Sequence, residues 1–220
     1  MNMLSMVQLM DVAPPQSGGY ADCFRVETLI AKGALKQPTE FKHLLVQALK
    51  LAIGPLDGFA AGAVFDASRH GDFSALPALV DTLCTANTPL SLQQASLSTG
   101  EYIWEVSRRW PWAAAIHDQL DGVTEQTGHF HAVAFGALIS DATAQKARAV
   151  AACLMTATKS LVLCAAKYLP MDLNQSQRLL NDVQPTVTQL AIEYSKPDAS
   201  APPPREPADI IASIASHAVD

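Results

Sequence analysis

The stretch TEFKHLLVQALKLA, residues 39–52, decides the fold class of this chain. Thr39 is a residue type that caps helices, and the apolar positions after it recur every three or four residues. These positions are Phe41, Leu44, Leu45, Ala48, Leu49 and Ala52. The pattern predicts an amphipathic helix that buries one side, and Gly54-Pro55 is expected to break or kink it.

Helical spacing continues along most of the chain. We expect a further helix over residues 57–68 and two long helices, one over 132–169 with an interruption near Asp141 and one over 174–194. Few segments alternate apolar and polar residues over the length of a strand, so no sheet is predicted. Hydrophobic residues make up 49% of the chain and aromatic residues only 6%, a balance that favours helix. The predicted fold class is all-α, a single-domain bundle of roughly eight to ten helices.

Three parts of the chain differ in composition. Residues 1–194 carry the helical pattern and are predicted to form the domain. Residues 195–207, SKPDASAPPPREP, read as a Pro-rich linker that is extended and mobile. Residues 208–220 form a C-terminal tail that is able to make a short helix, held loosely or only in a complex.

Charge and composition exclude several classes of partner. The net charge of −6 argues against nucleic acid, which needs a surplus of Lys and Arg on one face. The apolar stretch 149–166 contains Lys159, so a helix buried in the bundle explains it better than a membrane span. The N-terminus has no basic region typical of a signal peptide, and the four cysteines lack zinc spacing. We therefore predict a cytoplasmic protein with reduced thiols.

The sequence carries no recognisable catalytic motif. A phosphate-binding loop, G-x-S-x-G and H-E-x-x-H are all missing from it, so no catalytic residue, cofactor or firm metal site is predicted. His129 and His131 are the best metal candidates, but a firm site needs three or more ligands. One alternative is a helical enzyme that uses both histidines with a distant carboxylate, and a transient nickel contact through imidazole also stays open.

Several segments together resemble one family. Residues 131–136, HAVAFG, resemble the H-P-V-A-F-G element of the urease accessory protein UreF family. Residues 163–170 are similar to its A-A-V-R-L-x-P stretch, and residues 175–180 to its Q-x-x-G-Q-R-L-L element. Residues 95–100 resemble its R-x-A-S-x-x-Q-G segment, and residues 19–28 its Gly-aromatic step and G-L-E motif. The elements occur in the family's order over most of the chain.

The resemblance implies an all-helical protein that is not an enzyme. UreF-type proteins bridge a second accessory protein, UreD (also called UreH), and the GTPase UreG, which delivers nickel to urease. The implied role is that of a chaperone, a scaffold and regulator in nickel insertion, with the urease apoprotein as a further partner. Whether the chain forms a homodimer is left open. A further alternative is a helical interaction module without a urease context.

The resemblance also assigns roles to individual residues. The positions that it implies for partner binding are Tyr20, Glu27, His131, Lys167, Gln177 and Arg178. It implies structural roles for Gly100, Phe135 and Gly136. The chain departs from the family pattern at Ala132, which replaces Pro, and at Lys167, which replaces Arg. Its end at Asp220 also lacks the family's C-terminal motif, so the contact expected there with the second accessory protein is not carried over.

Overall fold

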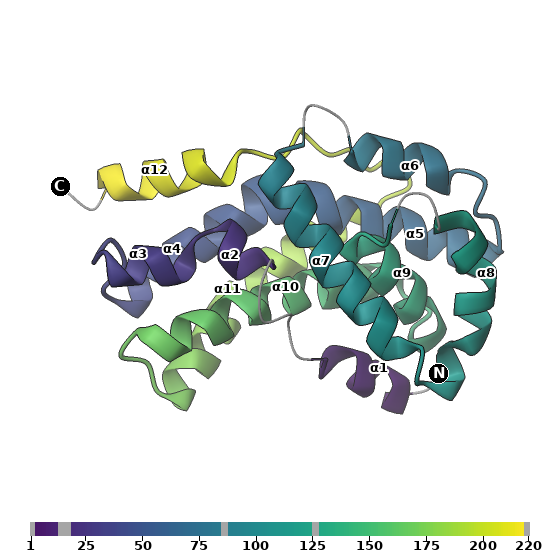
Figure 1. Ribbon diagram of the computed structural model, residues 1–220, viewed down its shortest axis with the longest axis horizontal. Coiled ribbons are helices and arrows are strands. Elements are labelled where there is room, and N and C mark those ends of the chain that lie inside the picture. The colour runs from purple at the N-terminus through teal and green to yellow at the C-terminus, as the bar shows by residue number, and fades with distance from the viewer. Residues whose placement is uncertain (1–2, 13–18, 85–87, 125–127, 218–220) are drawn as a thin grey trace.

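The structure, a computed structural model, describes residues 3–12, 19–84, 88–124 and 128–217. These residues form helices and turns with no β-strand, which confirms the all-α prediction. Figure 1 shows the helices gathered in one bundle. In chain order they are α1 (Met3–Met10), α2 (Tyr20–Cys23), α3 (Val26–Ala31), α4 (Pro38–Ala48), η1 (Leu49–Gly58), α5 (Phe59–His70), α6 (Leu76–Leu83), α7 (Leu90–Ser107), η2 (Pro111–Ala113), α8 (Ala114–Thr124), α9 (His131–Ala142), α10 (Lys146–Tyr168), α11 (Leu173–Tyr194) and α12 (Pro207–His217).

Helix α9 is the centre of the bundle. Every residue from 131 to 140 is buried, as expected for a helix that is apolar on all sides. It packs against α5, α7, α10, η1 and α1. The break after Ala142 matches the interruption expected near Asp141, and α10 then continues from Lys146.

A break or kink was expected at Gly54-Pro55, and the break does not occur. The chain stays helical from Pro38 to His70, because residues 49–58 widen into the π-helix η1 around Pro55. A β-carbon on Gly54 would lie 2.5 Å from the Leu49 carbonyl oxygen, so glycine suits this wide turn. No separate helix begins at Asp57. Instead, η1 leaves Asp57 buried in the middle of one long rod.

Two segments are long and apolar enough to cross a membrane by length and composition alone. They are the rod from Pro38 to His70 and α10, and 78% and 61% of their most apolar windows are buried inside the bundle. Such burial is typical of core helices, which pass the same test. It agrees with the expectation that residues 149–166 form a buried helix.

The C-terminal tail lies on the domain. Helix α12 packs against α4 and runs beside it in Figure 1. Ile210 and Ile214 are buried, at 1% and 8% exposure. The end of the Pro-rich segment is anchored as well, since the Arg205 backbone N–H donates to the Leu51 carbonyl at 2.7 Å. The mobility expected for the linker stays a prediction, and residues 218–220 of the predicted tail lie outside the described residues.

Gly136 lets α9 approach α5 closely, and its replacement tests that contact. A β-carbon there would lie 3.1 Å from the Ala61 carbonyl oxygen and 3.2 Å from the Val64 β-carbon. We expect Gly136→Val to lower the free energy of unfolding in urea by about 1–3 kcal/mol through overpacking. The control is Gly122→Val in α8, where an added β-carbon meets nothing within 4 Å. Equal losses in both variants would contradict the close-approach role.

Candidate functional site

A buried polar network lies where α2, η1, α7 and α9 meet. The Asp57 side chain, 1% exposed, accepts hydrogen bonds on both carboxylate oxygens. The Tyr20 hydroxyl donates a short bond to Oδ2, and the Ser96 hydroxyl donates to Oδ1 at 2.6 Å. Buried polar groups are stable only when they are paired in this way.

His131 closes the network into a ring. Its backbone N–H donates to the Ser96 hydroxyl oxygen at 3.2 Å, and its Nδ1 lies 3.1 Å from the Tyr20 hydroxyl. Because that hydroxyl gives its own proton to Asp57, the arrangement assigns the Nδ1–H tautomer to His131, with Tyr20 as the acceptor. The His131 backbone is thus linked to Asp57 through the Ser96 hydroxyl, and the His131 ring is linked to Asp57 through the Tyr20 hydroxyl.

The network also caps the central helix. Phe130, the residue before α9, offers no side-chain cap, and the first N–H groups of a helix have no partner within it. Ser96 from α7 supplies one acceptor to the N–H of His131. The Asp57 Oδ1 atom lies 3.9 Å from His131 Nδ1, next to the helix end whose dipole favours negative charge.

Gly100 lies one turn after Ser96 on α7 and brings the two segments together. A β-carbon at Gly100 would lie 1.9 Å from the His129 carbonyl oxygen and 2.4 Å from the carbonyl carbon of Phe130. Only glycine allows α7 to approach this backbone so closely. Ser96 and Gly100, four residues apart, therefore share the face of α7 that holds the start of α9.

Burial dominates the protonation equilibria in the network. Removal from water lowers the pKa of His131, and the neighbouring Asp57 only partly offsets this. Burial and then Asp57 raise the pKa of Tyr20 well above its ordinary value. The Cys153 thiol lies 3.8 Å from His131 Nδ1, and burial raises its pKa as well. Burial therefore favours the neutral forms of the His131 imidazole, the Tyr20 phenol and the Cys153 thiol. Neutral side chains suit a structural network better than a reactive one.

His129 and His131 do not converge on a shared site. The His129 ring stacks on Trp104 with centroids 4.6 Å apart, and its Nδ1 lies 3.2 Å from Glu101 Oε1. The His131 ring contacts Tyr20 and Phe135 instead. Within the described part of the chain, no three His, Cys, Asp or Glu side chains are grouped to hold a metal ion. The geometry thus gives no support to a metal centre that uses both histidines.

The residues carried over for partner binding fall into two groups. Tyr20 and His131 are fully buried, so neither side chain reaches a partner in this conformation, and both serve the internal ring. Glu27, Lys167, Gln177 and Arg178 are exposed, and partner contact stays a prediction for these four.

The structural positions behave as packing residues in this structure. Phe135 is fully buried, Gly136 meets α5, and Gly100 meets the segment before α9. Asp57 and Ser96 were not among the expected site residues. The signal for Asp57 was a single carboxylate in the apolar run 51–65, and Ser96 lay inside the quoted segment 95–100.

The exposed residues lie at the turn between α10 and α11, which we call the hairpin end. Lys167 is in the last turn of α10, and Arg178 is in the second turn of α11. Glu27 of α3 lies beside them, since it forms a hydrogen bond with the Tyr168 side chain of α10. This bond is the main cause that raises the pKa of the Tyr168 phenol. Large apolar side chains are exposed here too, with Leu163 at 42%, Tyr168 at 47% and Leu173 at 83%. Exposed apolar groups among charges are typical of interaction surfaces.

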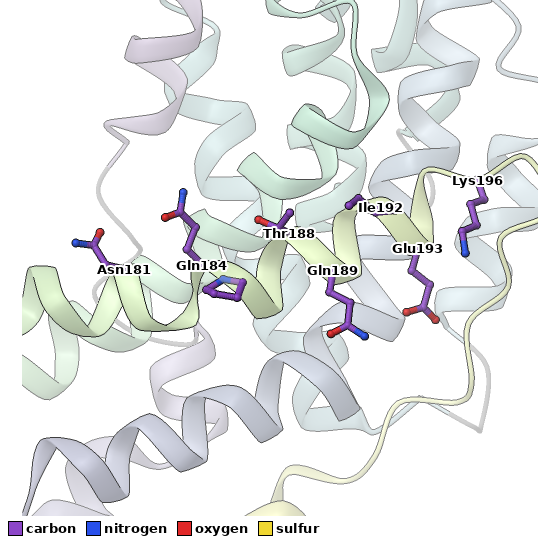
Figure 2. Close-up of a pocket in the computed structure, with 8 residues that line it drawn as sticks. Asn181, Gln184, Thr188, Gln189, Ile192, Glu193 and Lys196 are labelled. Carbon is purple, nitrogen blue, oxygen red and sulfur yellow. The ribbon is translucent and has the colours of Figure 1, made fainter.

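A shallow groove of about 750 Å³ follows the outer side of α11. Figure 2 shows that its lining side chains project from this helix and the residues just after it. They are Asn181, Gln184, Pro185, Thr188, Gln189, Ile192, Glu193 and Lys196. Amide, hydroxyl and aliphatic groups predominate, and Glu193 and Lys196 are the charged side chains among them.

The fold is that of an all-α protein. Its buried ring of Tyr20, Asp57, Ser96 and His131 connects α2, η1, α7 and α9. The UreF family pattern matches residues 35–184. The chain is 24% identical to the urease accessory protein UreF of Geobacillus kaustophilus over 184 residues, covering 83% of this chain and 80% of that protein. It is 23% identical to UreF of Bacillus sp. strain TB-90 and 21% identical to UreF of Lachnoclostridium phytofermentans, with similar coverage. The chain belongs to the UreF family.

Removal of the Asp57 carboxylate tests the buried ring. Asp57→Ala leaves the hydroxyls of Tyr20 and Ser96 without their acceptor in the core, so we expect the free energy of unfolding to fall by roughly 3 kcal/mol. The control is Asp66→Ala, which breaks a partly exposed ion pair with Lys146 and is expected to cost less than about 1 kcal/mol. Urea denaturation measures both, and a loss for Asp57→Ala no larger than that of the control would contradict the ring.

The neutral imidazole of His131 predicts a pH dependence of stability. Its pKa is lowered in the folded state, so below the ordinary value near 6.5 the unfolded chain binds more protons. Stability is therefore full above about pH 6.5 and falls as the pH drops toward the folded pKa. We expect His131→Gln to flatten the loss of stability between pH 7 and pH 5 in urea titrations. An unchanged slope in that variant would show that His131 does not contribute.

Proposed function

We propose that this chain is a urease accessory scaffold that bridges a second accessory protein of the UreD (UreH) type and the GTPase UreG during nickel insertion into the urease apoprotein. Membership of the UreF family carries the proposal, since the matched relatives are named urease accessory proteins. The proposed role is that of a non-enzymatic chaperone and regulator. The sequence has no phosphate-binding loop of its own, which fits a role in which the GTPase partner supplies the nucleotide chemistry.

The hairpin end is the surface that best fits the proposed contact. It combines the exposed cations Lys167 and Arg178 with the apolar side chains Tyr168 and Leu173. Arginine and aromatic residues are enriched in protein interfaces, and exposed cations form charge-assisted hydrogen bonds with partner carboxylates. We place the partner contact here and not at Tyr20 or His131, which hold the bundle together.

The proposed location is the cytoplasm. The four cysteines Cys23, Cys84, Cys153 and Cys164 are all free. Free thiols, one of them exposed at Cys84, are typical of a reducing compartment. This setting is the one in which a GTPase has access to its nucleotide.

Charge reversal at the hairpin end tests the proposed surface. We expect Lys167→Glu/Arg178→Glu to weaken binding of the cognate UreD-type protein or GTPase by at least about tenfold, because two favourable charges become repulsive. Co-purification at micromolar concentration, with nickel and GTP present, measures retention of each partner. The thermal midpoint of the variant is expected to stay within a few degrees of wild type, since both side chains are exposed.

The matched control is Arg109→Glu, an exposed cation in the turn after α7. In Figure 1, α7 ends on the far side of the bundle from the turn between α10 and α11. The control variant is expected to retain both partners. Equal retention by the double variant and the control would remove the hairpin end as the contact. If the wild-type chain retains neither partner under these conditions, the scaffold proposal itself is wrong.

A further inference from the structure

Helix α12 occupies an apolar groove on its own domain. Its Ile210 and Ile214, four residues apart, share one face of the helix and are buried. Ile211 and Ile214 of α12 face Leu29 of α3, Leu35 in the turn after it, and Leu44 of α4. An amphipathic helix with two or three apolar anchors in a groove is a recurring mode of protein recognition. Here the bound helix belongs to the same chain.

The π-helix η1 provides the anchor for the segment before α12. The π-helix contains Pro55, which has no N–H to donate, so the hydrogen-bond pattern of the rod is irregular at this turn. The Arg205 backbone N–H donates to that carbonyl at 2.7 Å. The tail is therefore bonded to the backbone of the irregular turn in the long rod.

The contact between α12 and the domain is incomplete. A crevice of about 330 Å³ lies at the start of α12, between α2, α7 and the tail, and Cys23, Ser91, Gln94 and Glu206 are among the residues that line it. Among the ion pairs of the described residues, none involves positions 195–217. The described contacts of this segment with the domain include the buried side chains of Pro207, Ile210 and Ile214 and the Arg205 backbone bond. Segments with few buried contacts open locally without unfolding of the whole domain.

The linker allows α12 to leave the groove without a change in the domain. Residues 195–206 contain Pro197 and the run Pro202 to Pro204. An extended Pro-rich segment spans about 3.1 Å per residue, so the helix is able to move by more than its own width while it stays tethered. The side chains uncovered by release, Leu29, Leu35 and Leu44, are all aliphatic.

We propose that α12 is a releasable intramolecular ligand of the α3–α4 groove. In the closed form the chain fills its own groove, and in the open form the groove accepts an amphipathic helix of another protein with apolar residues four positions apart. Tail release is then a switch that controls access to a second interaction surface, in addition to the hairpin end. This inference does not depend on the urease role, because it rests on packing within this chain alone.

Hydrogen exchange of the full-length wild-type chain tests whether α12 is releasable. We expect the backbone amides of residues 211–214 to exchange at least tenfold faster than those of α9 and α10, because α12 opens locally. Exchange of α12 at the same rate as the central helices would mean that it leaves only when the whole domain unfolds. That outcome overturns the proposal.

Binding of a helix added in trans tests the groove. The probe is a synthetic peptide of residues 205–217, added to the full-length Ile210→Asp/Ile214→Asp variant, whose own tail is displaced. We expect this variant to bind the peptide at least tenfold more tightly than wild type. The control variant, Ala212→Asp, adds a charge to the exposed face of α12 and is expected to behave as wild type.

Three outcomes of the peptide experiment contradict the proposal. Equal binding to the double variant and to wild type would show that α12 does not occupy the peptide site. Failure of the double variant to bind, with circular dichroism that shows a folded chain, would show that the groove does not accept a helix. A double variant that fails to fold would show that α12 is an integral part of the domain, and this result would also overturn the proposal.

Discussion

The carboxylate of Asp57 is buried at the crossing of four helices, where it accepts one hydroxyl proton from α2 and another from α7. A buried carboxylate is costly unless its oxygens are satisfied, so Tyr20 and Ser96 must lie within hydrogen-bond distance of it. Both hydroxyls then accept from His131, and this fixes the start of the central helix α9. Through these bonds one side chain of the long rod is connected to α2, α7 and α9.

The remaining packing extends from the same junction. Gly100 lets α7 lie against the segment before α9, and one turn further Trp104 stacks on His129 and donates to Asp121 at 3.0 Å. Gly136 lets α5 approach the other side of α9. The residues that the resemblance carries over therefore divide into an interior set around α9 and an exposed set at the hairpin end. This division leaves the surface free for partners while the interior holds the bundle.

Local patterns in the sequence predicted the helices well where one amphipathic face extends over several turns, as in α4, α10 and α11. They failed at Gly54-Pro55, because a proline inside a helix usually ends it. Here the tertiary structure supports the π-helix, with Leu51 paired to Arg205, 154 positions later in the chain. The pairing of Asp57 with Ser96 joins positions 39 residues apart, and periodicity carries no information about such contacts. Tyr20 and His131 were identified from the family resemblance, yet only the fold shows that they face inward.

The central claim is that Tyr20 and Ser96 act together through one carboxylate, and a double-mutant cycle tests it most directly. Urea denaturation of Tyr20→Phe, Ser96→Ala and the double variant gives the coupling free energy between two residues on different helices. A shared acceptor predicts a coupling of about 1 kcal/mol or more. Losses that add within about 0.3 kcal/mol would show that the two hydroxyls act independently, and the account of Asp57 as the organising side chain would be wrong.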